Sequence, residues 1–152
     1  MNFEWLLERQ LSWISQADSK LSVLGPLPLA MLAISLSGAS VDFGNFSWMD
    51  VPVFMSTILL SVSLLFAKWA LSPKLDGPEA SVIFFGRIAE STAEDFAKQV
   101  METDEASFRQ DILKQVHRNA LIAQQKHRNI RLSIFWLACA TPLWLLSVAL
   151  EF

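Results

Sequence analysis

Hydrophobic residues gather in three long blocks along this chain instead of recurring at the spacing of a soluble core. The blocks run from about 21 to 39, from 51 to 71 and from 134 to 150. A bilayer core about 30 Å thick requires about 20 apolar residues in a helix, with about 17 as the lower limit, so each block is long enough to span it. The pattern predicts three transmembrane helices.

The residues before the first block predict an amphipathic helix that runs straight into the first span. Their apolar positions, with one acid among them, recur at spacings of three and four: Phe3, Leu7, Leu11, Ile14, Asp18 and Leu21. Gly25, Pro26 and Pro28 lie near the start of the block. Because proline removes a backbone donor, we expect a kink there.

A polar segment of some sixty residues separates the second block from the third. Pro73, Gly77 and Pro78 predict a turn at its start, and the residues from Glu79 to about Val100 are predicted to form one helix. A second helix is expected to begin after Thr103 or Asp104, either of which suits an N-cap.

The second of these helices is predicted to continue unbroken into the third span, because the next proline is Pro142. One face of it begins apolar and turns polar towards the membrane: Phe108, Ile112, Gln115, Asn119, Ile122, Lys126, Asn129 and Ser133. Polar residues in such a seam either fix a partner helix or line a wet functional surface. An unpaired carboxylate beside a span is costly, so Asp18 is expected to have a partner, with Lys126 or Arg118 as candidates.

The basic residues predict the orientation of the spans. Residues 40–50 contain no Lys or Arg, whereas residues 72–133 contain nine. The positive-inside rule therefore places 72–133 and the N-terminus in the cytoplasm. The predicted fold is all-α: a cytoplasmic amphipathic helix (1–20), two transmembrane helices with a short external loop (21–71), a cytoplasmic helical hairpin (72–133) and a third transmembrane helix (134–152).

Composition supports a membrane protein and excludes some chemistry. Of the 152 residues, 53% are hydrophobic and 18% charged, and one cysteine permits no intramolecular disulfide. No catalytic motif is present, so we expect no enzyme. The net charge of -3 conceals a split, because 75–111 holds nine acids and three bases whereas 112–133 holds five bases and no acid.

The basic stretch has two open interpretations. Lys and Arg next to a span can anchor it to anionic headgroups, or they can bind the phosphates of a ligand. Amide side chains interleave with these charges, and amides can also bind bases or sugars. Serines at 35, 37, 56, 61 and 63 can either line a pore or pack helices together.

Three short runs resemble the Pycsar transmembrane effector family in the same order along nearly the whole chain. They are Ala-Asp-Ser-Lys at 17–20, Phe-Phe-Gly-Arg-Ile-Ala at 84–89, and residues 115–123 followed by Lys126. The resemblance implies a bacterial anti-phage effector that responds to a nucleotide second messenger and impairs the inner membrane, causing abortive infection. Related nucleotide-signalling systems, including CBASS and Hailong, also use small membrane effectors. His117 and His127 stand where an aromatic residue is commoner in the family.

From the resemblance and the charge pattern together, we expect a nucleotide-gated homo-oligomeric channel or pore, for example a ring of four copies. The nucleotide, made by a cyclase or nucleotidyltransferase, is the expected regulatory ligand, with no other cofactor. Its predicted contacts are Asp18, Lys20, Phe85, Arg87, Gln115, Arg118, Asn119 and Lys126. The identity of the nucleotide and the sign of its effect stay open. Two rival functions are a ligand-independent holin-like pore or toxin, and a scaffold that docks a protein partner on the acidic residues of 76–111.

Overall fold

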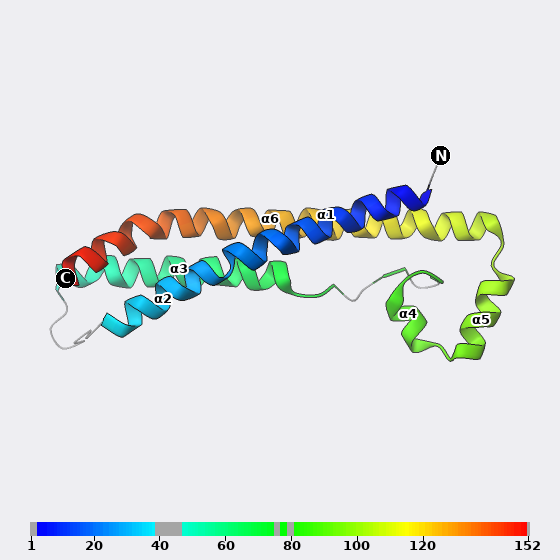
Figure 1. The fold of residues 1–152 in the computed structure, drawn as a ribbon, viewed down its shortest axis with the longest axis horizontal. Helices are drawn as coiled ribbons and strands as arrows, with labels where there is room; N and C mark the ends of the chain where they lie inside the picture. Colours follow the sequence, from blue (N-terminus) through cyan, green and yellow to red (C-terminus); the bar gives the residue numbers. More distant parts are fainter. Residues whose placement is uncertain (1–2, 39–46, 75–76, 79–80, 152) are drawn as a thin grey trace. The chain divides into compact units, whose positions relative to one another are not determined.

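The computed structural model describes residues 3–38, 47–74, 77–78 and 81–151, and every regular element within them is helical (Figure 1). The elements are α1 (Phe3–Leu24), α2 (Pro26–Gly38), the 3-10 turn η1 (Trp48–Asp50), α3 (Val51–Leu71), α4 (Phe85–Glu90), α5 (Ala93–Glu102) and α6 (Glu105–Glu151). Three helical stretches are long and apolar enough to cross a membrane, within Phe3–Ser37, Val51–Leu71 and Glu105–Leu150. The predicted all-α class is confirmed, and each of the three apolar blocks lies in a helical stretch long and apolar enough to span a membrane.

The first span is interrupted where the sequence predicts a kink. Helix α1 ends at Leu24 and α2 begins at Pro26, so the N-terminal helix does not run into the span without a break. The amide of Gly25 donates to the Leu21 carbonyl at 2.7 Å, and a Cβ on Gly25 would lie 2.8 Å from that oxygen. Glycine is therefore required at the break.

Helix α6 begins where predicted and continues for 47 residues, with Pro142 inside it. Of the two candidate caps, Asp104 is the one whose carboxylate accepts from the Ser107 amide, at 2.8 Å. Hydrogen bonding to Ser107 also holds the pKa of Asp104 below its ordinary value, because it stabilises the charged form. The continuity of this helix into the third span is confirmed.

The expectation of one helix from Glu79 to Val100 is wrong. Residues 81–84 form a bend, and α4 and α5 are two short helices separated at Ser91 and Thr92. The backbone of Thr92 is extended, and its hydroxyl accepts from the Asp95 amide at 3.1 Å. Ser and Thr side chains can form hydrogen bonds with nearby backbone groups in place of the helical ones, which explains the break between α4 and α5.

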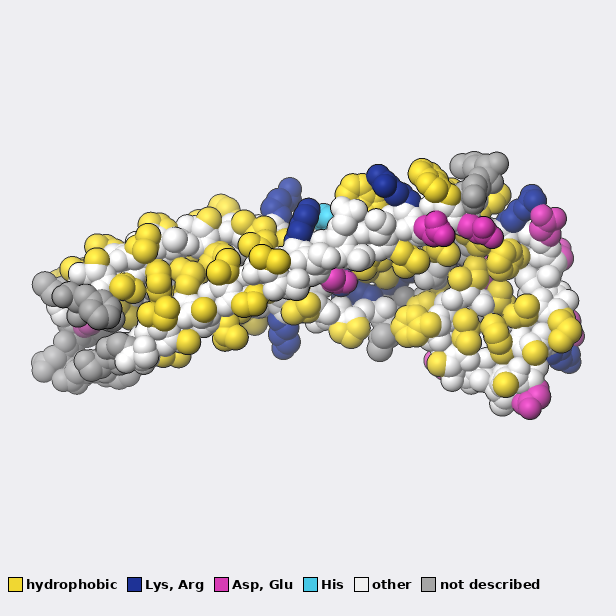
Figure 2. Space-filling view, in the orientation of Figure 1, with side chains coloured by type: hydrophobic (Ala, Val, Ile, Leu, Met, Phe, Trp, Pro, Cys, Tyr) yellow, Lys and Arg dark blue, Asp and Glu magenta, His cyan; other side chains and the backbone are white. Residues whose placement is uncertain are grey.

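The chain divides into two compact units. The polar unit comprises residues 1–16 and 73–125, and the apolar unit comprises residues 17–72 and 126–152. In the apolar unit, a buried cluster packs α1, α3 and α6 together: Ala17, Leu21, Ala67, Ala70 and Ile130. Figure 2 shows hydrophobic side chains covering the visible face of α2, α3 and the end of α6, which suits helices surrounded by lipid.

Burial along α6 follows a period of seven, as the predicted seam requires. The positions at this period that are buried or nearly so are Ile112, Asn119, Lys126, Ser133, Ala140 and Ser147. Two apolar members of the predicted stripes are exposed within the single chain, Phe108 at 40% and Leu11 at 50%. On α1 the buried residues are Ala17, next to the predicted Asp18, and Leu21.

Candidate functional site

An ion pair joins α1 to α6 within the apolar unit. The ammonium of Lys126 donates to a carboxylate oxygen of Asp18 at 2.5 Å. The Lys126 side chain is 12% exposed and that of Asp18 is 45% exposed. The sequence predicts a cationic partner for Asp18, and Lys126 is confirmed as that partner.

The pair is held by close packing on its apolar side. Ala17, which directly precedes Asp18, is fully buried, and Ile130, one turn beyond Lys126, is 5% exposed. Both belong to the cluster that joins α1, α3 and α6. Small residues at such a contact let the helix backbones approach closely, so the side chains of Asp18 and Lys126 can meet.

A second polar contact joins α3 to α6 deeper in the apolar unit. The hydroxyl of Ser63 donates to the Ser133 carbonyl at 2.8 Å and lies 3.1 Å from the Ser133 hydroxyl. Ser63 is fully buried. Interhelical bonds of this kind contribute about 0.6 kcal/mol on average in membrane proteins, so this contact fixes register more than it adds stability.

The two interpretations of the serines can now be separated by burial. Ser35, Ser56 and Ser63 are between 0% and 3% exposed within a single chain, so they pack helices together. Ser37 and Ser61 are exposed, and their hydroxyls donate to carbonyls of their own helices. These two are the members of the predicted set that remain available to a pore.

In the polar unit, a buried carboxylate on α6 holds the bend before α4. One oxygen of Asp111 accepts from the Ser81 hydroxyl at 3.0 Å and from the Val82 amide at 2.9 Å. Asp111 is 7% exposed. Asp111 was not among the site residues predicted from the sequence, although its place four residues before Gln115 puts it on the same helix face.

The next polar residues on this face form a short chain. The Gln115 amide donates to the Asn119 carbonyl oxygen at 3.3 Å, and Asn119 is 5% exposed. The second oxygen of Asp111 and the oxygen of Gln115 are buried with no hydrogen-bond partner among the described residues. A buried acceptor without a donor is costly, so this face has unused capacity to accept hydrogen bonds.

The predicted ligand contacts therefore divide between the two units. Asp18, Lys20 and Lys126 belong to the apolar unit, and the remaining five belong to the polar unit: Phe85, Arg87, Gln115, Arg118 and Asn119. The structure pairs Asp18 with Lys126 and Gln115 with Asn119.

Two other predicted contacts are placed on α4. The Arg87 guanidinium donates to Glu90 at 2.7 Å, with its side chain 42% exposed. Phe85 is 61% exposed, and its ring centroid lies 5.0 Å from that of the buried Phe84. The bond to Glu90 involves the Nη1 nitrogen of Arg87, and Phe85 presents its ring to solvent. The ligand roles of all eight residues stay predictions.

The described residues offer little to metal chemistry. Nowhere within them do three His, Cys, Asp or Glu side chains come together as a metal site would require. The polar groups that do converge are carboxylates, amides and an ammonium on helix faces, which can accept and donate hydrogen bonds.

These features define a class: a small helical membrane protein in which an ion pair, with its ammonium shielded from water, joins two helices beside their apolar stretches. The family model described as the Pycsar effector protein domain matches residues 2–151, so the chain belongs to this family of anti-phage effectors. Membership implies a membrane context and a nucleotide second messenger as the signal. No curated protein and no solved structure gives a significant match.

Proposed function

We propose that this chain is a nucleotide-gated effector that forms a homo-oligomeric channel or pore in the bacterial inner membrane. The observation that carries the proposal is the pair between Lys126 and Asp18. It is an ion pair between two helices, each of which continues into an apolar stretch, and one partner is open to solvent. Such a pair can respond to a charged ligand.

The physical basis is competition for the ammonium. A nucleotide phosphate forms a strong charge-assisted hydrogen bond with an ammonium group. Asp18 and a phosphate cannot both be the close partner of Lys126 without added repulsion between them. Binding of the nucleotide at Lys126 therefore weakens the link between α1 and α6, and the ligand favours the state in which the two helices are less tightly joined.

An assembly of several copies follows from the small number of spans. Three helices that pack closely on one another leave no channel inside one chain, and in the apolar unit their contact is filled by three alanines together with Leu21 and Ile130. A ring of copies can enclose a pore, and cyclic symmetry is the usual solution for identical subunits. Ser37 and Ser61 are exposed hydroxyls suited to its lining.

The test is the conductance of the purified protein in liposomes, with and without a panel of cyclic and linear nucleotides. We expect one nucleotide to change the current. Lys126→Met should abolish that response, and Asp18→Asn should increase the apparent nucleotide affinity because the competing anion is removed. The matched control is Arg128→Gln, an exposed cation on the same helix, which should keep the response.

The outcomes separate the rival functions. A current that is insensitive to every nucleotide, with all variants behaving as wild type, would refute gating and favour an unregulated pore. An absence of current in all conditions, together with function in infected cells that depends on the acidic residues of 76–111, would favour a scaffold for a protein partner.

A further inference from the structure

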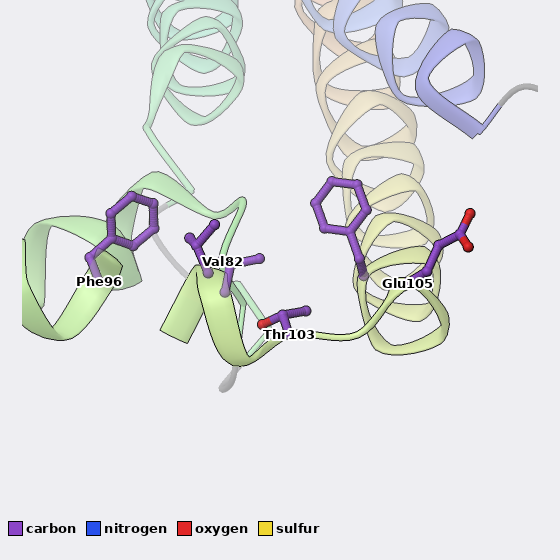
Figure 3. Close-up of a pocket in the computed structure, with 6 residues that line it drawn as sticks. Val82, Phe96, Thr103 and Glu105 are labelled. Atoms are coloured by element: carbon purple, nitrogen blue, oxygen red, sulfur yellow. The ribbon is translucent and has the colours of Figure 1, made fainter. Parts of the chain in front are cut away.

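The polar unit contains an apolar cleft between α5 and the start of α6. Its volume is about 530 Å³, and it is lined by Val82, Phe96, Val100, Thr103, Glu105 and Phe108. Figure 3 shows Phe96 and Glu105 on opposite walls, with Val82 and Thr103 between them. A second, more polar cleft of about 560 Å³ adjoins it, since both are lined by Val82 and Thr103.

The apolar face of α5 is not covered within the chain. None of its ten residues, all of which the structure describes, is buried. Val100 is 46% exposed and Met101 is 81% exposed, while Phe108 on the facing wall is 40% exposed. A helix of this length is marginal without tertiary packing. Exposed apolar surface of this extent outside a lipid-facing segment marks an interaction site.

The charge of this part of the chain disfavours two kinds of occupant. Glu102 lines the polar cleft and Glu105 lines the apolar one. Each charged group of the clefts has an ion-pair partner on its own helix: Arg87 with Glu90, Glu102 with Lys98 at 3.9 Å, and Glu105 with Arg109 at 2.6 Å. Figure 2 shows acidic and basic side chains beside the hydrophobic ones over this part of the chain. Residues 75–111 nevertheless hold nine acids and three bases, and this net negative charge disfavours phosphates and anionic lipid headgroups and suits an apolar surface that carries a cation.

The chain itself presents a surface of that kind on α1. Trp5 and Trp13 are 57% and 40% exposed, and the exposed Arg9 lies between them at a spacing of four. These three residues lie along one side of the helix, and the Arg9 guanidinium lies 5.2 Å from the centroid of the Trp13 ring. Tryptophan and arginine are the residues that most often dominate binding energy at protein interfaces.

The start of this α1 surface and the cleft lie at the same height along the axis of α6. Within one polar unit the Arg109 guanidinium lies 6.0 Å from the Phe3 ring, and Arg109 is adjacent in sequence to the cleft residue Phe108. The first turns of α1 are therefore level with the cleft wall. A rotation about an axis parallel to α6 keeps that level, so a neighbouring copy presents its α1 where the cleft can receive it.

We propose that the α5–α6 cleft binds the Trp5–Arg9–Trp13 face of a second copy of this chain. The tryptophans cover Phe96 and Val100, and Arg9 faces Glu105, which lines the same cleft. The contact is head-to-tail, because each copy offers its α1 face on one side and its cleft on the other, and such contacts generate rings when the rotation closes. The inference rests on the oligomer in the proposed function and names its interface.

The first test is disulfide cross-linking between two differently tagged copies in a Cys139→Ser background, which removes the chain's one cysteine. One copy carries Trp5→Cys and the other carries Val100→Cys. Because each cysteine is on a different chain, a heterodimer linked under mild oxidation reports a contact between copies. The matched control is Lys98→Cys, on the opposite side of α5 and 73% exposed. Strong cross-linking at position 100 and little at 98 is expected, whereas equal or absent cross-linking at both would overturn the proposal.

The second test is a charge exchange that does not depend on a cysteine. Arg9→Glu should weaken self-association in detergent by about tenfold or more, the scale of an interface hot spot. Adding Glu105→Lys should recover it, because Glu105 lines the cleft together with Phe96 and Val100. No recovery, with both variants folded, counts against the interface. Nucleotide response is measured separately on the wild type, so an ungated protein that still cross-links refutes the gating but not this contact.

Discussion

The partners of the Asp18–Lys126 ion pair are unequally shielded from water, and this predicts unequal effects of removing each one. Lys126 is 12% exposed, whereas Asp18 is 45% exposed. Asp18→Asn leaves an ammonium that is largely out of water with no counter-charge. Lys126→Met leaves a carboxylate that water can still reach. The substitution of the aspartate should therefore be the more destabilising of the two.

The expected magnitudes lie between two known limits. Exposed pairs contribute about 0.2–1 kcal/mol, whereas removing one partner of a buried pair costs about 3–5 kcal/mol. With one shielded and one half-exposed partner, we expect Asp18→Asn to cost about 2 kcal/mol and Lys126→Met about 1 kcal/mol. The corresponding changes in the unfolding equilibrium constant are about 30-fold and about fivefold.

The assay is unfolding in mixed micelles of increasing SDS fraction, followed by fluorescence of the six tryptophans. The double variant should cost less than Asp18→Asn alone, because the stranded ammonium is gone. Glu8→Gln, on an exposed residue of α1, is the matched control and should change stability little. A greater loss for Lys126→Met than for Asp18→Asn, or strict additivity in the double variant, would refute the reasoning.

Three further predictions concern the contacts around this pair. Ser63→Ala should cost about 1 kcal/mol and Ser63→Leu about 3 kcal/mol in the same unfolding assay, because leucine overpacks a fully buried helix contact; equal costs would contradict this. Asp111→Ala should release the bend at Ser81, with faster proteolysis there and about 1–3 kcal/mol of local stability lost, whereas an unchanged cleavage rate would contradict the role of the carboxylate. The Asp104 cap should be lost only at a pH below the ordinary pKa of an aspartate, because the folded state lowers the pKa of Asp104: its contribution is fully present above the unfolded pKa and is lost as the pH falls through the folded pKa. The amide resonance of Ser107 reports that loss by NMR and should not titrate in Asp104→Asn.

The spans and the largest helix were predictable because their signals are strong and local. Helix α3 has the bounds that the apolar block predicts, from Val51 to Leu71. The start of α6 follows from the capping chemistry of Asp104, and its continuity follows from the absence of a breaker before Pro142. The partner of Asp18 was also predictable, since an acid beside a span requires a cation and few cations are placed where they could contact it.

The polar unit was harder to predict because its contacts depend on pairs distant in sequence. The break at Ser91 and Thr92 had a signal in the capping spacing of Thr92 and Asp95, but the surrounding residues also favour helix. The bond between Asp111 and Ser81 joins residues thirty positions apart, and no periodicity reveals such a contact. The predicted ligand residues rest on local motifs, which do not determine how the two units contribute to one site.

The break between α1 and α2 has a consequence for hydration. Pro26 and Pro28 have no amide hydrogen, so the carbonyls of Ser22 and Leu24 lack the donor that a continuous helix would supply four residues later. Hydrocarbon cannot satisfy these oxygens, whereas water can. Water molecules should therefore accompany the chain to the level of Gly25, making this the wettest part of an otherwise apolar stretch, and lipid headgroups should be drawn towards it.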